Sequence, residues 1–349
     1  MPTLSPRLRA VSILLLACCG VACAQAPVRT VDSAVPRAVT PIPVRYDEHR
    51  WVVRPVTTAG DTLDIYTDTG GDPVFIARDA FRRGGVTFTF VDTTARGDSA
   101  FTAPWPRFQP DATIPVPLGG ASAGRFTSTT RAAFKAGYAP RPPHPGRDGL
   151  IGSDWFAGRV WRFDYPGRTL SLLPANTPAA PLGPAPAGGV TVLLGFKEAP
   201  PAEAPNYPRV RVTIDGEPLD LLFDTGAYTV LTDSARRAIG DGRAASRAAS
   251  FIARSVFDRW RARHPNWRVV PRAEAGSGQD MIEVPAIAIG GLNAGPVWFT
   301  ARSDRAFHEF MSQWMDRRVD GALGGSGLQY FRVTVDYPHR RATFARPTG

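Results

Sequence analysis

The chain has 349 residues, a length that suggests two domains of ordinary size. Gly and Pro contribute 34 residues each, which argues against long helices or coiled coils and favours short strands joined by turns. All three cysteines, Cys18, Cys19 and Cys23, lie near the N-terminus, which excludes a disulfide scaffold, a cysteine-ligated metal centre and a cysteine nucleophile in the rest of the chain. The net charge of +10 is scattered apart from one arginine-rich segment, so we expect no nucleic-acid partner.

The N-terminus has the pattern of an export signal. Arg7 and Arg9 precede an apolar run from Ala10 to Ala22, and Ala22-Cys23-Ala24 fits a signal peptidase site. The run has about 13 residues where a membrane span needs roughly 20, so we expect no integral span. Residues 1–24 are therefore predicted to be a signal peptide of a periplasmic or secreted protein. A lipid anchor at Cys18, giving an outer-membrane lipoprotein, is the alternative.

Alternating or continuously apolar segments predict a mostly β chain. In the N-terminal half we expect a short helix at Arg78–Arg83 and strands at Arg50–Val56, Leu63–Thr67, Val86–Asp92 and Val160–Tyr165. The uncharged segment Pro174–Gly189 is rich in Pro, Ala and Gly, a composition typical of an extended linker. In the C-terminal half we expect helices at Asp233–Ile239 and near Ala248–Arg263, and strands at Arg209–Ile214, Leu219–Phe223, Ile282–Ile289, Val297–Ala301 and Phe331–Tyr337.

Three sequence blocks occur twice and in the same order, which indicates an internal duplication. The pairs are Leu63–Ile76 with Leu219–Thr232, Gly119–Gly124 with Gly290–Gly295, and Asp148–Leu173 with Asp320–Ala345. The last pair aligns without a gap. The duplication predicts an N-terminal lobe at residues 25–173, the linker at 174–189 and a C-terminal lobe at 190–349.

Each copy carries Asp-Thr-Gly directly after an apolar strand, at residues 68–70 and 224–226. Two aspartates brought face to face cannot both ionise easily, so the pair holds one proton. The ionised member can then take a proton from water while the protonated member donates to a carbonyl oxygen. Glycine after Asp-Thr lets the backbone turn sharply and approach the carboxylate.

These motifs resemble those of the pepsin and retropepsin superfamily of aspartic proteases, in which each lobe supplies one Asp-Thr/Ser-Gly loop. In that family a later apolar-apolar-Gly segment threads beneath each loop, and Asp148–Gly152 and Asp320–Gly324 are similar to it. The resemblance covers most of residues 50–173 and 205–345. It implies a mostly β, bilobal pepsin/retropepsin-like fold with pseudo-twofold symmetry.

The resemblance also implies roles for particular residues. Asp68 and Asp224 would be the catalytic pair, and Asp72 and Tyr228 stand where the family contacts substrate backbone. The family's flap would lie in Val86–Phe108 or Phe251–Val270, by position alone. The supporting residues would be Thr69, Gly70, Thr225 and Gly226 in the loops, with Thr69 and Thr225 locking them together, and Ile151, Gly152, Leu323 and Gly324 in the threading segments.

We therefore expect an aspartic endopeptidase that cleaves polypeptides without a metal or cofactor, acts best at acid pH, and carries one site between two lobes of a monomer. A catalytically inactive, exported binding or envelope protein is the alternative, favoured by the polar Thr67 and the unequal pair Asp72 and Tyr228. A dimer in which lobes pair between chains is a third possibility.

Other acidic residues have structural interpretations. Asp148 and Asp320 would cap turns before the threading strands, and Asp164 and Asp336 would form hairpin turns. Asp64 and Asp220 would face solvent or a turn.

From Arg243 to Arg272 there are eight arginines against one aspartate, Asp258. Ile252, Val256 and Trp260 recur there at helical spacing, which favours a surface helix docked by that face. An element at the cleft edge that favours acidic substrates or an anionic surface is the alternative.

Overall fold

The computed structural model describes residues 38–71, 75–85, 89–93, 99–104, 108–109, 114–115, 131–135, 148–198 and 206–347. The chain divides into two units, residues 1–32 and 33–349, and every described residue lies in the second. The predicted signal peptide, Cys18 and Asp72 lie outside the described residues. The described part is mostly β, as the sequence predicts.

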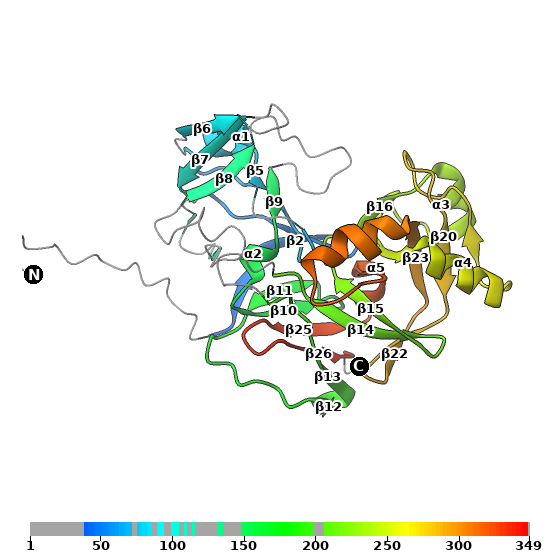
Figure 1. Cartoon of the computed structure of the whole chain (residues 1–349). Helices are drawn as coiled ribbons and strands as arrows, with labels where there is room; N and C mark the ends of the chain where they lie inside the picture. Colours follow the sequence, from blue (N-terminus) through cyan, green and yellow to red (C-terminus); the bar gives the residue numbers. More distant parts are fainter. Residues whose placement is uncertain are drawn as a thin grey trace, which may run out of the picture. The chain divides into compact units, whose positions relative to one another are not determined.

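The elements follow one another as short strands with few helices (Figure 1). The N-terminal half contains β1 (Thr40–Ile42), β2 (Val44–Asp47), β3 (Arg50–Val53), β4 (Ile65–Thr67), β5 (Phe75–Ile76), α1 (Arg78–Arg83), β6 (Thr89–Thr93), β7 (Ser99–Pro104), β8 (Arg131–Lys135), β9 (Gly149–Ile151), α2 (Ser153–Phe156), β10 (Val160–Asp164) and β11 (Thr169–Leu172). The predicted linker contains β12 (Gly183–Ala185) and the 3₁₀ turn η1 (Pro186–Gly188), and it ends where β13 (Gly189–Leu193) begins.

The described part of the C-terminal half also consists mostly of short strands. It contains β14 (Arg209–Ile214), β15 (Glu217–Phe223), β16 (Tyr228–Val230), α3 (Asp233–Ile239), β17 (Ser246–Ala248), β18 (Ser250–Ala253), α4 (Arg254–Arg263), β19 (Val269–Val270), β20 (Met281–Val284), β21 (Ile287–Ile289), β22 (Leu292–Ala294), β23 (Val297–Arg302), the π-helical segment η2 (Arg305–Met311), η3 (Ser312–Trp314), β24 (Gly321–Leu323), α5 (Gly325–Leu328), β25 (Arg332–Asp336) and β26 (Arg341–Ala345).

A seven-stranded sheet joins the two halves in the order β1-β11-β10-β25-β26-β13-β12. At its centre β10 and β25 run antiparallel with Arg162 opposite Thr334. The outer strands are arranged alike on both sides, because β1 pairs with β11 and β13 pairs with β26, each antiparallel. The halves are therefore held by backbone hydrogen bonds as well as by side chains.

The strands before the two Asp-Thr-Gly loops have matching surroundings. β4 pairs in parallel with β9, and β15 pairs in parallel with β24. β9 also pairs antiparallel with β5, and β24 with β18. The helix that follows β5 is α1 and the helix that follows β18 is α4, so α4 rather than α3 has the same place in the strand order as α1. Residues 228–249, which hold β16, α3 and β17, separate the second loop from β18.

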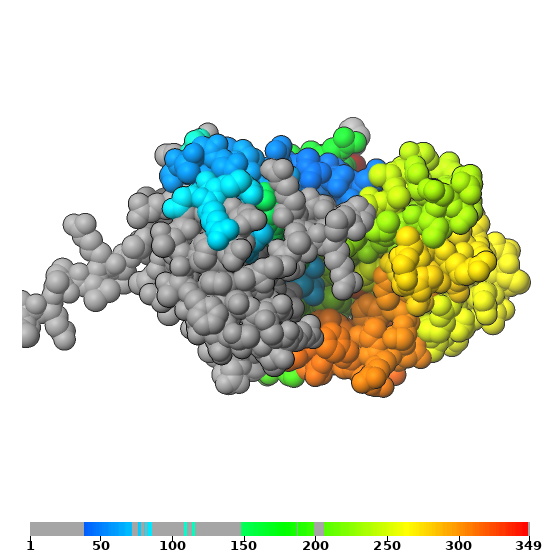
Figure 2. Space-filling view, turned by 90° about the horizontal axis from the view of Figure 1, so that it is seen from above, coloured from blue at the N-terminus to red at the C-terminus, as the bar shows by residue number. Residues whose placement is uncertain are grey.

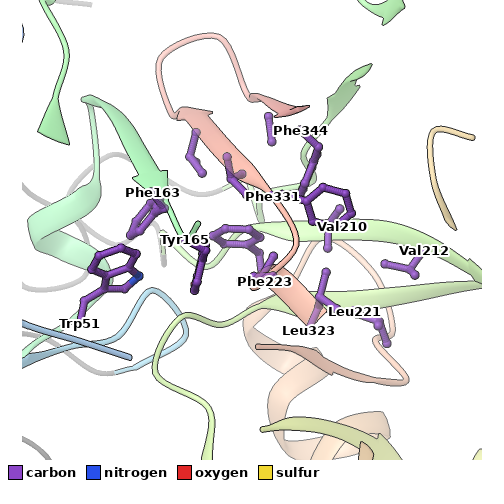
Figure 3. Packing of buried hydrophobic residues seen from close by; sticks show 14 of the residues in the cluster. Trp51, Phe163, Tyr165, Val210, Val212, Leu221, Phe223, Leu323, Phe331 and Phe344 are labelled. Atoms are coloured by element: carbon purple, nitrogen blue, oxygen red, sulfur yellow. The ribbon is translucent and has the colours of Figure 1, made fainter. Parts of the chain in front are cut away.

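A hydrophobic core runs through both halves (Figure 3). The ring centroids of Trp51 and Tyr165 are 5.2 Å apart, and those of Phe163 and Phe223 are 6.2 Å apart. Phe223, which directly precedes Asp224, thus packs against an aromatic residue of the other half. This close packing supports the two Asp-Thr-Gly loops on a rigid apolar core.

Most predicted elements are confirmed, and two need correction. The predicted helix near Ala248–Arg263 begins only at Arg254, because Ser250–Ala253 forms β18 between β23 and β24. The predicted strand Ile282–Ile289 is split into β20 and β21 around Pro285, since proline has no N–H to donate to a strand ladder.

Candidate active site

The two Asp-Thr-Gly loops follow β4 and β15, and the threading strands hold both of them. The N–H of Asp68 donates to the carbonyl oxygen of Ile151 at 2.9 Å, and that of Asp224 donates to the carbonyl oxygen of Leu323 at 3.0 Å. Gly152 and Gly324 come directly after these acceptors. A Cβ at Gly324 would lie 2.0 Å from the carbonyl oxygen of Ala249, so only glycine fits there.

The threonines of the two loops bond across to the opposite half. The hydroxyl of Thr69 donates to the carbonyl oxygen of Phe223 at 2.7 Å and accepts from the N–H of Thr225 at 2.9 Å. The hydroxyl of Thr225 accepts from the N–H of Thr69 at 3.2 Å. Both threonines are fully buried, so these bonds do not compete with water.

The carboxyl groups of Asp68 and Asp224 lie next to each other. The side chains of Asp68 and Asp224 share a hydrogen bond. A Cβ added to Gly226 would lie 2.2 Å from Cγ of Asp68, and one added to Gly70 would lie 2.8 Å from Cγ of Asp224. Each carboxyl group therefore lies over the glycine of the opposite loop.

Backbone donors fix the orientation of each carboxylate. The N–H of Gly70 donates to Oδ1 of Asp68, and the N–H of Gly226 donates to Oδ1 of Asp224, both at 2.9 Å. The N–H of Ala227 donates to the backbone carbonyl oxygen of Asp224 at 3.4 Å. Asp224 is buried and Asp68 is partly exposed. Burial raises the pKa of Asp224, although the neighbouring Asp68 side chain and the N–H groups of Gly226 and Ala227 oppose it.

Thr67 is polar where the family that the sequence resembles has an apolar residue, and the structure accounts for it. Its side chain is fully buried, and its hydroxyl donates to the carbonyl oxygen of Trp51 at 3.1 Å. A buried hydroxyl that has a hydrogen-bond partner costs little folding free energy. The hydrogen bond to Trp51 therefore explains how a polar residue is accommodated at this buried position.

Tyr66 is a site residue that the motif analysis missed. Its buried hydroxyl donates to the carbonyl oxygen of Gly226 at 2.8 Å. Its ring lies perpendicular to that of Tyr228, with centroids 6.1 Å apart, and the guanidinium of Arg50 lies 5.9 Å from the Tyr228 ring. The signal was present in the repeat, because Tyr66 aligns with Leu222 and only the tyrosine carries a polar group.

The aspartates that begin the threading segments have structural contacts. Asp148 is buried, with Oδ2 accepting from the N–H of Asp64 at 2.7 Å and Oδ1 accepting from Arg83 at 2.6 Å. Oδ1 of Asp320 lies 3.2 Å from Arg318 and 3.3 Å from His308.

The other four acidic residues divide into two groups. Asp164 and Asp336 are turn residues as predicted, accepting from the N–H groups of Gly167 at 2.9 Å and His339 at 3.0 Å. Asp64 and Asp220 do not simply face solvent. Asp64 pairs with Arg54 at 2.7 Å, and Asp220 pairs with Arg209 at 2.5 Å and Arg211 at 2.8 Å.

The arginine-rich segment is largely neutralised. Helix α4 lies at the surface (yellow in Figure 2) and buries Val256, Phe257 and Trp260, so the docked helix is the interpretation that the structure favours. Seven of the eight arginines have carboxylate partners: Arg243 with Glu48, Arg247 with Asp241, Arg254 with Asp280, Arg259 with Glu217, Arg261 with Asp258, Arg263 with Asp215 and Arg268 with Glu283. They therefore offer little free positive charge.

The described residues were also compared with what a metal site, a membrane span and the predicted flap would require. Within the described ranges, no three His, Cys, Asp or Glu side chains gather as a metal site would require. No helix in the same ranges has both the length and the apolarity to cross a bilayer. Of the two flap candidates, Phe251–Val270 contains most of β18, all of α4 and all of β19, whereas the described parts of Val86–Phe108 include β6 and β7, which pair antiparallel.

No protein-family profile matches the chain, and no curated protein matches it in sequence. Its function is therefore inferred from the geometry of the two loops.

Proposed function

We propose that the chain is an aspartic endopeptidase that hydrolyses peptide bonds at the Asp68–Asp224 pair. The observation that carries the proposal is the shared hydrogen bond of two aspartates that approach each other over glycines of opposite loops. Such a pair keeps one proton, which is what general acid–base attack of water on a carbonyl requires. Cross-bonded threonines would hold the geometry through the reaction.

In the proposed reaction, the ionised aspartate takes a proton from water as the oxygen attacks the scissile carbonyl carbon. The protonated aspartate donates its proton to the carbonyl oxygen, and a tetrahedral gem-diol forms. Collapse of this intermediate breaks the C–N bond, and a proton passes to the leaving amine. Rates should be highest at acid pH, where the pair holds one proton.

The proposal extends to the architecture. The matching sets β4/β9/β5 and β15/β24/β18, together with the paired β10 and β25, support an internal duplication and a bilobal pepsin/retropepsin-like fold. Because both loops come from one chain and bond directly to each other, a monomer with one site is favoured over a dimer that pairs lobes between chains. The boundaries 25–173, 174–189 and 190–349, and export to the periplasm or outside the cell, remain predictions from sequence.

The test compares the chain without residues 1–24 with its Asp68→Asn and Asp224→Asn variants. Each is incubated with a denatured protein between pH 3 and pH 8, with and without pepstatin. We expect cleavage by the parent but by neither of these two variants, and pepstatin should abolish it. Asp233→Asn is the matched control, because its side chain is 82% exposed on α3 and should leave cleavage unchanged. Equal cleavage by all four proteins, or none by the folded parent, would favour the inactive binding protein.

A further inference from the structure

A chain of hydrogen bonds leads from the N-terminal half to the carboxylate of the other half. The hydroxyl of Tyr66, on β4, donates to the carbonyl oxygen of Gly226 at 2.8 Å. Gly226 in turn donates its own N–H to Oδ1 of Asp224 at 2.9 Å. The Tyr66 hydroxyl therefore holds in place the residue whose N–H orients the carboxylate, and a fixed N–H donor favours the ionised carboxylate.

The relay has no counterpart in the other direction. Leu222 holds the place on β15 that Tyr66 holds on β4, two residues before the aspartate. It also lies against the glycine of the opposite loop, because a Cβ at Gly70 would be 2.8 Å from Cδ2 of Leu222. Leucine has no polar hydrogen to donate, so Leu222 cannot hold Gly70 in place as Tyr66 holds Gly226. The pair is therefore asymmetric by construction.

We infer that Tyr66 is a positioning residue that acts through Gly226 to orient Asp224 and to stabilise its ionised form, an inference that rests on the proposed function. It deepens that function by giving the two aspartates different roles. Asp224 is the more buried and holds the shared proton, while the more exposed Asp68 activates water. The hydrogen bonds from Tyr66 through Gly226 lower the affinity of the Asp224 carboxylate for that proton.

Several titratable or charged groups face this pair. Asp68 is the direct partner of Asp224, and Tyr66 senses Arg50 and Tyr228 as well as both aspartates. Tyr165 lies within electrostatic range of Asp224, and Tyr337 lies within electrostatic range of Asp68. Burial raises the pKa of Tyr66, Tyr165 and Tyr337, so all three stay neutral where the pair works. A change confined to the Tyr66 hydroxyl therefore reports on the relay.

The variant Tyr66→Phe removes the hydroxyl and keeps the ring that packs on Tyr228. The pH profile of kcat/KM has a lower limb, where the second proton binds, and an upper limb, where the last proton leaves. If Asp224 holds the proton, weakening its ionised form moves only the upper limb, by roughly 0.3 pH unit to higher pH. We also expect kcat to fall about fivefold with KM unchanged, since the change affects orientation and not substrate contacts.

The matched control is Tyr337→Phe. Its buried hydroxyl has no hydrogen-bond partner among the described residues, so its loss makes the same chemical change without touching the relay. We expect the control to leave both limbs in place. Thermal melting of all three proteins shows whether they fold alike.

Unmoved limbs in a folded Tyr66→Phe protein would overturn the inference, as would equal shifts in Tyr337→Phe. A shift of the lower limb alone would support the relay but overturn the assignment of the proton to Asp224. A titration of the aspartate carboxyl carbons by NMR, in the parent and in Tyr66→Phe, needs no activity. If the parent proves inactive, the proposed function fails, but an Asp224 pKa raised by the variant still supports the relay and an unchanged one overturns it.

Discussion

The hydroxyl of Thr69 donates to the carbonyl oxygen of Phe223, a residue 154 positions further along the chain and immediately before Asp224. The same hydroxyl accepts from the N–H of Thr225. One oxygen atom therefore ties the loop of one half to both the strand and the loop of the other. We therefore expect this atom to help set the separation of the two aspartates.

Thr69→Ala should destabilise the protein by about 2 kcal/mol, because it leaves a buried carbonyl oxygen and a buried N–H without partners. Cleavage should fall at least tenfold at pH values where the variant is still folded. Thr69→Ser keeps the hydroxyl and serves as the control. Urea unfolding with equal midpoints for Thr69→Ala and Thr69→Ser would contradict the prediction.

Gly226→Ala should remove activity while the protein still folds. The added Cβ would meet Cγ of Asp68 at 2.2 Å, and the carboxyl group must swing away from Asp224. Cleavage and pepstatin affinity should both drop more than a hundredfold, since misplacing a reacting group by about 1 Å has an effect of that order. Gly167→Ala is the control, because its Cβ would meet the carboxyl group of the turn residue Asp164 instead. Retained pepstatin binding by Gly226→Ala would show that the site tolerates the methyl group.

Asp224→Asn should stabilise the fold at pH 7. Burial raises the pKa of Asp224 above its ordinary value of 3.8, so the folded protein binds this proton more tightly than the unfolded chain does. The stability that this provides is present below pH 3.8 and is lost as the pH rises through the folded value. Asparagine has no charge to lose, so the variant should gain about 1.4 kcal/mol over the parent at pH 7 for each unit of the shift. Chemical unfolding at pH 3.5 and pH 7 measures this, and the same difference at both pH values would refute it.

His49 should limit stability at acid pH. It lies in the left-handed turn between β2 and β3, its Nδ1 is 2.7 Å from the hydroxyl of Tyr46, and burial, with Arg243 nearby, lowers its pKa to about 4. The folded state therefore favours neutral histidine. This contribution is present above pH 6.5 and is lost as the pH falls through about 4, with a total of roughly 3 kcal/mol.

His49→Asn removes the titrating group, and asparagine tolerates the left-handed backbone. The variant should lose stability less steeply than the parent between pH 6.5 and pH 4, which thermal melting measures. Parallel pH dependences for the two proteins would show that another group controls acid stability.

The triple variant Arg254→Gln, Arg259→Gln, Arg261→Gln should cleave acidic and basic peptides in the same ratio as the parent. These arginines pair with Asp280, Glu217 and Asp258, so little positive charge is free to attract substrate. Exposed pairs contribute about 0.5 kcal/mol each, so the melting temperature should fall only slightly. A loss of preference for acidic peptides would restore the cleft-edge interpretation of this segment.

The residue pattern within a single element predicted its bounds correctly where interactions between neighbouring residues determine them. Helix α3 has the predicted bounds because Thr232 caps it by accepting from the N–H of Ala235 and Gly240 ends it in the left-handed region. The spacing of Ile252, Val256 and Trp260 predicts that all three lie on a helix, yet Ile252 lies in β18. Burial requires an apolar residue in either structure, and only the pairing of β18 with β23 and β24 distinguishes them.

The sequence alone determined which residues can form the site, since two copies of Asp-Thr-Gly in equivalent blocks of a repeat are visible without a structure. Tertiary structure decided how they meet: the crossing threonine bonds, the glycines beneath the opposing carboxyl groups, and the unequal burial of Asp68 and Asp224. It also decided that Tyr66 belongs to the site, through a hydroxyl that reaches the other half. Contacts between residues more than 150 positions apart depend on how strands pair, and composition and spacing within a single strand carry no record of that pairing.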